Sequence, residues 1–301
     1  MIGSVRIRGF RCLLDVKIGF GPLTALVGPN GSGKSAVVDA LTPVTFPARD
    51  HWRHQDKPID ILIEHDGGAQ SHRVGNSLPK ENRVEVQKLQ LHLAALRAEN
   101  EVVETPALKP DGTNLTSAFD TLSRPAQQEL VAQFTRIVPL YQDVDAKPSA
   151  IAGRKRLVFQ DRWQAGLWYE PYEVSDGSLF TLALLLLQFQ SVPLDLIAIE
   201  EPERGLHPYL VGELVRMLRA LSRAELGPRA IQVVLATHSA DLLNCLEPSE
   251  VRFLTRSEED GSTQVEVAPT GSPDWTRAYK EYDRSMGRIW LSGGMGGVPG
   301  G

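Results

Sequence analysis

Apolar and polar residues alternate along two segments near the start of the chain, 5–8 and 16–20. A period of two is typical of strands that bury one face. The next segment, 23–27, does not alternate and is almost wholly apolar, so it predicts a strand buried on both faces. A helix-forming run follows at 35–41. This part of the chain is therefore expected to contain a strand, a loop and a helix in that order.

The pattern becomes regular again after residue 173. Two buried strands are expected at 194–199 and 231–236, and two helices at 178–190 and 208–222. Strands that alternate with helices along a chain form a mostly parallel sheet with helices on both faces. The fold class expected from this pattern is α/β.

A less regular stretch separates these two parts. Strand-like alternation occurs at 59–63 and 84–86, a loop is expected at 104–116, and an amphipathic helix is expected at 118–137. We interpret this stretch as an inserted lobe together with strands that return to the core. The expected divisions are 1–42 (N-terminal half of the core), 43–170 (inserted lobe and returning strands), 171–255 (C-terminal half of the core) and 256–301 (C-terminal extension and Gly-rich tail).

The loop after the first buried strand carries the pattern G-x-x-x-x-G-K-[ST]. Glycines in this pattern let backbone N–H groups turn toward phosphate oxygens at a helix N-terminus. Lys34 is expected to reach the β- and γ-phosphates, and the Ser35 hydroxyl is expected to hold Mg²⁺. We therefore expect the chain to bind a nucleoside triphosphate. The expected nucleotide-binding residues of this segment are Gly28, Pro29, Asn30, Gly31, Ser32, Gly33, Lys34, Ser35 and Ala36.

The buried strand at 194–199 leads into two carboxylates, Glu200 and Glu201. The carboxyl ends of parallel strands meet at one edge of a sheet, so these acids are expected beside the phosphate-binding loop. We expect Glu200 to hold Mg²⁺ and Glu201 to act as general base toward an attacking water. A strand that ends in solvated charges is the simpler alternative.

Two further segments are compatible with the same chemistry. His238 follows the last buried strand, where a sensor of the γ-phosphate is needed, although a hydrogen-bonded loop histidine is the simpler alternative. Ser175, Asp176 and Gly177 open an apolar helix. Ser175 or Asp176 can cap that helix, and the same N-terminus can hold a phosphate of a nucleotide bound to a partner subunit. Both roles can hold together.

Composition narrows the class of protein. The 301 residues carry a formal net charge of −5, which argues against a strongly basic nucleic-acid coat protein. Cys12 and Cys245 are too few for a disulfide scaffold and lack metal-ligand spacing. The longest apolar run, 182–187, is far shorter than the ~20 residues that cross a bilayer, and the strand pattern begins too close to Met1 for a signal peptide. We expect a cytoplasmic protein that does not bind a membrane.

Taken in chain order, these motifs resemble those of the ABC-type ATPases of the SMC/RecF/OLD group, and most of all the stand-alone OLD-like AAA-family ATPases. The resemblance covers roughly 1–42 and 170–255. It implies an ABC-ATPase-like P-loop NTPase with a mostly parallel core sheet, an N-terminal antiparallel β region and an inserted lobe. The segments that carry it are 8–13, 26–35, 175–177 (a shortened signature motif), 200–208 (Walker B and D-loop) and 237–239 (switch histidine).

The resemblance also implies a mechanism. Two heads enclose two ATP molecules, and Ser175 of one head contacts the γ-phosphate held by Lys34 of the other. ATP closes this homodimer and hydrolysis reopens it. The resemblance places Arg11 near the nucleotide. The glutamine that links the metal to the moving lobe is not identified, and Gln55 and Gln87 are its candidates.

Several uses of such a head remain open. We favour the ATPase component of an OLD-like nucleic-acid-processing or phage-defence system. Many relatives join this head to a TOPRIM nuclease, and the chain ends about sixty residues after His238, so a separately encoded effector is expected. A RecF-like DNA repair ATPase and a slow ATP-dependent switch are alternatives. A transporter subunit is disfavoured because the segment at 174–177 lacks a full Leu-Ser-Gly-Gly-Gln signature.

Three segments are candidates for contacts with partners. The segment at 49–57 mixes basic and aromatic residues, and 154–156 is a basic cluster. Such surfaces suit the backbone of duplex DNA, although both segments can equally be solvated surface. The aromatic-rich segment at 275–290 can dock a partner protein or pack onto its own core.

Overall fold

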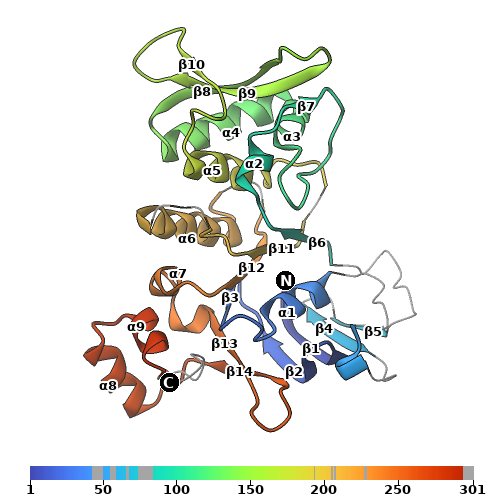
Figure 1. Cartoon of the computed structure of the whole chain (residues 1–301), viewed down its shortest axis with the longest axis vertical. Helices are drawn as coiled ribbons and strands as arrows, with labels where there is room; N and C mark the ends of the chain where they lie inside the picture. Colours follow the sequence, from blue (N-terminus) through green and yellow to red (C-terminus); the bar gives the residue numbers. More distant parts are fainter. Residues whose placement is uncertain are drawn as a thin grey trace.

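A six-stranded sheet in the order β14-β13-β3-β12-β11-β6 forms the centre of the protein in this computed structural model (Figure 1). Neighbouring strands run parallel from β13 to β6, and β14 pairs antiparallel with β13. The α/β class and the mostly parallel core are confirmed. The residues that the structure describes are 1–42, 50–54, 59–65, 68–73, 84–192, 194–204, 206, 208–226 and 229–293. The strands of this sheet are β3 (Leu23–Val27), β6 (Val86–Leu89), β11 (Leu196–Glu200), β12 (Gln232–Thr237), β13 (Val251–Arg256) and β14 (Thr263–Val267).

The N-terminal strands form a second sheet, antiparallel throughout, in the order β2-β1-β4-β5. Buried residues of β1 share an apolar core with one face of the central sheet and with α1 (Lys34–Leu41). Val37 and Val38 of that helix are fully buried. This packing fixes the start of α1 at the carboxyl end of β3. The strands are β1 (Ile2–Phe10), β2 (Leu13–Gly19), β4 (Asp60–His65) and β5 (Gly68–Arg73).

A separate lobe lies at one end of the molecule, at the top of Figure 1. Its small sheet has the order β10-β9-β7, and β8 pairs with β9. Helices α2 to α5 pack beneath this sheet, and Phe134, Tyr141 and Phe159 form an aromatic cluster between them. The elements are α2 (Leu93–Leu96), β7 (Asn100–Glu101), α3 (Leu115–Thr121), α4 (Arg124–Ile137), β8 (Tyr141–Pro148), β9 (Arg154–Asp161), β10 (Trp168–Tyr169) and α5 (Asp176–Leu186).

Two helix predictions in this lobe were wrong in detail. The pattern predicts one helix over 118–137, but the structure has α3 and α4 with a break at Ser123. The Ser123 hydroxyl accepts a hydrogen bond from the backbone N–H of Ala126, and Pro125 lies in the first turn of α4, where its missing N–H costs little. Helix α5 also begins and ends earlier than the predicted 178–190.

The remaining helices cover the other face of the central sheet and the C-terminal end of the chain. Trp275, Ile289 and Trp290 are buried in the main apolar core, so the segment at 275–290 packs onto its own protein. Within the described part of the chain, no helix is long and apolar enough to cross a membrane. The helices are α6 (Pro208–Ser222), α7 (Ala240–Asn244), α8 (Pro273–Glu281) and α9 (Met286–Leu291), with short 3-10 helices η2 (Trp52–His54) and η4 (Pro248–Glu250).

Candidate nucleotide-binding site

The phosphate-binding loop connects the carboxyl end of β3 to the first residue of α1. Gly28 is required for close packing, because a Cβ there would lie 2.3 Å from the carbonyl oxygen of Leu254. The loop is closed from the other side by Thr263, whose hydroxyl donates to the Ser32 carbonyl oxygen at 2.9 Å. Pro29 is half-buried, whereas Asn30, Gly31 and Ser35 are exposed. The loop therefore has a rigid base and an accessible rim.

Lys34 folds back over this loop. Its Nζ donates to the carbonyl oxygens of Gly28 at 2.7 Å and Pro29 at 2.9 Å. Burial lowers the pKa of Lys34, and the nearby carboxylates of Glu201, Glu200 and Glu203 partly oppose that shift. The ammonium group and the acidic strand end therefore share one electrostatic environment, as the two motifs predict.

The acidic residues lie where β11 ends and the chain turns. Glu200 is the last residue of β11 and is largely buried. Glu201 adopts a left-handed backbone conformation, with φ of 47°, and its N–H donates to the carbonyl oxygen of Ala236 at 2.8 Å. A non-glycine residue in this region carries strain of about 1–3 kcal/mol. Strain of this kind clusters at functional sites, and here it turns Glu201 away from the strand.

His238 comes directly after β12 and meets the acidic segment. Its Nδ1 lies 3.2 Å from Oε1 of Glu201. The preceding Thr237 donates its hydroxyl to Oε1 of Glu203 at 2.5 Å. Burial raises the pKa of Glu203, and the hydrogen bond from Thr237 only partly offsets this. The structure thus brings the predicted histidine and the predicted base together.

Lys88 and Asp39 complete this cluster, although sequence reasoning missed both. Lys88 lies on β6, and its Nζ is 2.6 Å from Oδ1 of Asp39 on α1 and 3.1 Å from Oε1 of Glu200. Burial alone would lower the pKa of Lys88, but the hydrogen bond to Asp39 and the charges of Asp39 and Glu200 raise it overall. The sequence signal was weak, because a lysine in an alternating strand ordinarily points to solvent.

Arg11 lies beside α1 and holds two carboxylates. Its guanidinium contacts Asp39 at 2.5 Å and Asp50 at 2.8 Å. Its backbone φ of 47° is left-handed. Arg11 is therefore linked to the phosphate-binding helix through Asp39, and no hydrogen bond or ion pair between Arg11 and the described residues of the loop is present. The expected proximity to nucleotide stays a prediction.

The segment of Ser175, Asp176 and Gly177 begins α5, in the lobe at the top of Figure 1, apart from α1. The Ser175 hydroxyl accepts a hydrogen bond from the backbone N–H of Ser178 at 3.3 Å, so the predicted helix cap is confirmed. Asp176 pairs with Arg97 at 2.5 Å. One chain does not bring this segment to its own phosphate-binding loop, and contact with nucleotide on a partner stays a prediction.

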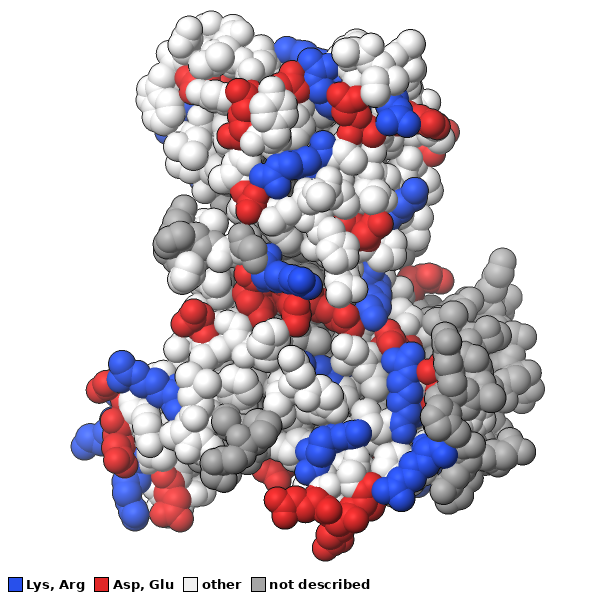
Figure 2. Space-filling model, in the orientation of Figure 1, with Lys and Arg blue, Asp and Glu red and all other residues white. Residues whose placement is uncertain are grey.

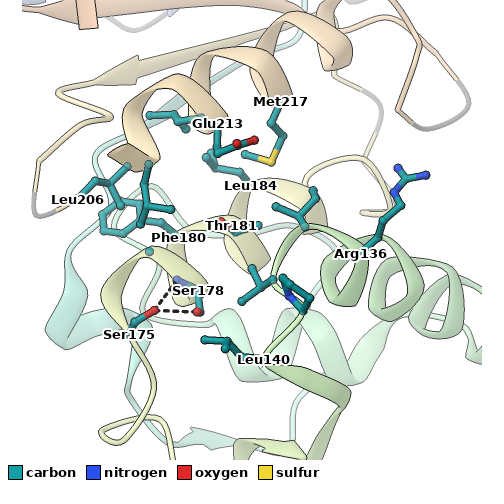
Figure 3. Close-up of a pocket in the computed structure, with 16 residues that line it drawn as sticks. Arg136, Leu140, Ser175, Ser178, Phe180, Thr181, Leu184, Leu206, Glu213 and Met217 are labelled. Atoms are coloured by element: carbon teal, nitrogen blue, oxygen red, sulfur yellow. Dashed lines mark hydrogen bonds between the residues drawn. The ribbon is translucent and has the colours of Figure 1, made fainter. Parts of the chain in front are cut away.

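A cavity of about 610 Å³ lies beside Ser175, between the ends of α4, α5 and α6 (Figure 3). Its lining is mostly apolar and includes Phe180, Leu184 and Met217. Leu206, from the segment after the acidic strand end, also lines it. The first turn of α5 packs closely against α6 beside this cavity, because a Cβ on Gly177 would lie 2.3 Å from Cδ1 of Leu210.

Two residues of the basic cluster at 154–156 are neutralised by ion pairs within the protein. Lys155 pairs with Asp120 at 2.7 Å, and Arg156 pairs with Glu170. On the face in Figure 2, acidic side chains gather at the waist of the molecule. The cluster at 154–156 is thus poorly suited to bind DNA backbone.

The aromatic segment at 49–57 is also engaged within the protein. Trp52 is buried, and the Arg53 guanidinium lies over its ring and donates to the backbone oxygen of Asp260. Arg49, Gln55 and Lys57 lie outside the described residues. The amide of Gln87 donates to the Leu108 carbonyl oxygen at 2.7 Å, an internal contact that does not identify it as a metal-linking glutamine.

The donor set suits Mg²⁺ without forming a complete protein cage. Hydroxyl and carboxylate oxygens of the Ser35 and Glu200 type are ligands that Mg²⁺ prefers, together with phosphates and water. Among the described residues, no group of three or more His, Cys, Asp or Glu side chains is arranged to hold a metal by itself. Within the described residues, the buried atoms Oγ of Ser32, Oε1 of Glu200 and Oε2 of Glu203 have no hydrogen-bond partner. A metal here would take ligands from nucleotide phosphates.

Known proteins resemble this chain in sequence and in fold. Two family models match, one described as "AAA ATPase domain" over 1–70 and one as "AAA domain, putative AbiEii toxin, Type IV TA system" over 117–244. An OLD nuclease from Thermus scotoductus (strain ATCC 700910 / SA-01) is 46% identical over 62 residues, which are 21% of this chain and 12% of that nuclease. The match therefore covers a small part of the nuclease.

Solved structures extend the likeness to most of the chain. The SMC head domain from Thermotoga maritima superposes with a TM-score of 0.52 at 16% identity, covering 88% of this chain and 98% of that one. An SMC head bound to the C-winged helix domain of ScpA gives a TM-score of 0.54 at 14% identity, covering 90% and 98%. At these identities the likeness concerns the fold. The family matches, the local identity to an OLD nuclease and the SMC-head fold together make this chain similar to the ATPases of the SMC/OLD group.

Proposed function

We propose that this chain binds ATP with Mg²⁺ and hydrolyses it at the phosphate-binding loop. The observation that carries the proposal is the convergence of Lys34, Glu200, Glu201 and His238 at the carboxyl ends of β3, β11 and β12. Ligands of open α/β sheets bind at this edge of the sheet. Phosphoryl transfer needs positioning and charge stabilisation, which these residues can supply.

Each residue has a defined part in this proposal. Backbone N–H groups of the loop and Lys34 hold the β- and γ-phosphates, which requires Lys34 to leave the carbonyl oxygens of Gly28 and Pro29. Ser35 and Glu200 hold Mg²⁺, which when bound neutralises charge that develops on the phosphates. Glu201 accepts a proton from the attacking water, and its contact with His238 orients the imidazole toward the γ-phosphate.

We further propose that two chains enclose two ATP molecules. In this homodimer, Ser175 and its neighbours Asp176 and Gly177 contact the γ-phosphate held by the partner's loop. The exposed Ser175 at the start of α5, on a lobe separate from α1, supports a contact made between chains. The N-terminus of α5 suits an anion because the dipole of a helix favours negative charge at this end, although the N–H of Ser178 is already held by Ser175.

The biological role that we propose is the ATPase component of an OLD-like nucleic-acid-processing or phage-defence system, working with an effector protein. Local identity to an OLD nuclease and the toxin-related family description support this proposal. A TOPRIM-type nuclease is the kind of effector expected. Duplex DNA remains a candidate regulator through surfaces other than 154–156.

Steady-state ATP turnover of the purified chain tests the proposal. We expect Mg²⁺-dependent turnover in the wild type and loss of at least about 100-fold in Lys34→Ala, because the variant lacks the phosphate-binding ammonium. Lys155→Ala is the matched control, since it removes a paired lysine far from the loop. Equal turnover in Lys34→Ala would overturn the site, and duplex DNA that leaves turnover unchanged would direct the search to a protein regulator.

A further inference from the structure

Lys88 lies between two carboxylates that belong to different elements of the core. Its side chain is 27% exposed, while those of Asp39 and Glu200 are 24% and 11% exposed. The ammonium nitrogen is within 3.1 Å of Glu200 Oε1 and 2.6 Å of Asp39 Oδ1. An ion pair this well shielded from water differs from a surface salt bridge, because removing one partner leaves a charge that water cannot fully solvate.

The sheet register explains how a lysine reaches this place. β6 and β11 are parallel, and Lys88 is paired in register with Ala198, two residues before Glu200. Alternate residues of a strand share a face, so Lys88, Ala198 and Glu200 lie on the same side of the sheet. The small side chain of Ala198 leaves room for the lysine stem to extend toward the strand end.

Other charged groups near Glu200 are already engaged. Lys34 interacts with the carboxylates through its charge. Its hydrogen bonds, however, go to the carbonyl oxygens of the loop. The second oxygen of Asp39 is held by Arg11. Among the described residues, Lys88 is therefore the cation in direct contact with Glu200.

We propose that Lys88 is a positioning residue for Glu200, an internal counter-ion that holds this carboxylate before the metal arrives and must yield it when Mg²⁺ binds. The inference rests on the proposed role of Glu200 as a metal ligand. The Lys88 ammonium and a divalent cation compete for the carboxylate oxygens of Glu200, because two positive groups at the same oxygens repel each other. Lys88 keeps a partner when it yields Glu200, because Asp39 remains beside it. When the metal binds, it thus replaces Lys88 as the counter-ion of Glu200.

Metal dependence of nucleotide binding tests the competition. Binding of a fluorescent ATP analogue is measured against Mg²⁺ concentration for the wild type, Lys88→Met and Lys88→Arg. Methionine keeps the stem and removes the charge, so the half-saturating Mg²⁺ concentration should fall by about tenfold, while arginine should stay near the wild-type value. An unchanged or higher Mg²⁺ requirement in Lys88→Met would overturn the competition.

Thermal unfolding without nucleotide tests the counter-ion role independently of ATP. Lys88→Met should lower Tm by several degrees because Glu200 is left without its cation. Adding Glu200→Gln should recover most of that loss, since the unpaired charge is removed. Strictly additive losses in the double variant would overturn the role of Lys88. If the wild type binds no analogue, the proposed function fails, and this thermal cycle still decides the contact between Lys88 and Glu200.

Discussion

Two glycines of the phosphate-binding loop allow a controlled test of the site geometry. Gly33 and Gly31 both have positive φ, 108° and 80° respectively. A Cβ on Gly33 would lie 2.5 Å from Oγ1 of Thr263 and 3.0 Å from Sγ of Cys12, whereas a Cβ on Gly31 would meet no atom within 4 Å. Alanine therefore adds backbone strain at both positions, but steric crowding at Gly33 alone.

The expected magnitudes follow from these contacts. Backbone strain costs about 1–2 kcal/mol in each variant. Gly33→Ala adds about 1–3 kcal/mol of overpacking, because Thr263 cannot turn aside without losing its hydrogen bond to the Ser32 carbonyl oxygen. The free energy of unfolding, measured in urea without nucleotide, should thus fall by about 2–5 kcal/mol for Gly33→Ala and about 1–2 kcal/mol for Gly31→Ala.

Measuring Gly33→Ala in a Thr263→Ala background separates the steric part of its destabilisation from the backbone strain. In Thr263→Ala the clashing hydroxyl is absent, so Gly33→Ala should cost at least about 1 kcal/mol less than in the wild type. Equal costs for Gly33→Ala and Gly31→Ala, or no relief in the Thr263→Ala background, would refute the packing that we describe around the start of α1.

Other predictions concern the acidic strand end. Glu201→Gln should reduce ATP turnover by about 10²–10⁴-fold because the general base is lost. The free energy of unfolding should change by less than about 1 kcal/mol, since the contact with His238 joins side chains that are 34% and 48% exposed. A loss of turnover that is matched by an equivalent loss in the free energy of unfolding would contradict this. Glu203 has a raised pKa in the folded protein, so its contribution to stability is fully present below its ordinary pKa of 4.5 and is lost as the pH rises through the raised value. Glu203→Gln cannot ionise and keeps an oxygen for the Thr237 hydroxyl, so its Tm should exceed that of the wild type at pH 8 and converge with it toward pH 5. Parallel Tm curves for the two proteins would show that burial does not raise this pKa.

Sequence patterns predicted the structural features that are determined by residues close together in the chain. The phosphate-binding loop is continuous in the chain, and the buried strands around it have an apolar pattern that sheet burial requires, so strand, loop and helix were expected in their observed order. The helix break at Ser123 also has a local sequence signal, a serine two residues before Pro125. The amphipathic pattern across 118–137 nevertheless led us to predict one continuous helix.

Contacts between distant residues could not be predicted in the same way. Lys88 meets Asp39 across 49 positions and Glu200 across a strand pair, so neither contact leaves a local signal. Lys155 is neutralised by Asp120, 35 positions away, which made 154–156 look like a free basic cluster. Burial of Trp275 and Trp290 likewise depends on the tertiary fold and resolved an ambiguity that the aromatic pattern left open.

The most direct test of the proposed ATP-enclosing head is the mass of the Glu201→Gln chain in solution with Mg²⁺ and ATP, measured by light scattering. This variant should bind ATP without turning it over, so we predict twice the mass of the single chain with ATP and the single mass without it. Adding Ser175→Arg, which blocks the contact with the partner's phosphate, should restore the single mass. ATP bound at one molecule per chain with no change in mass would contradict the dimer.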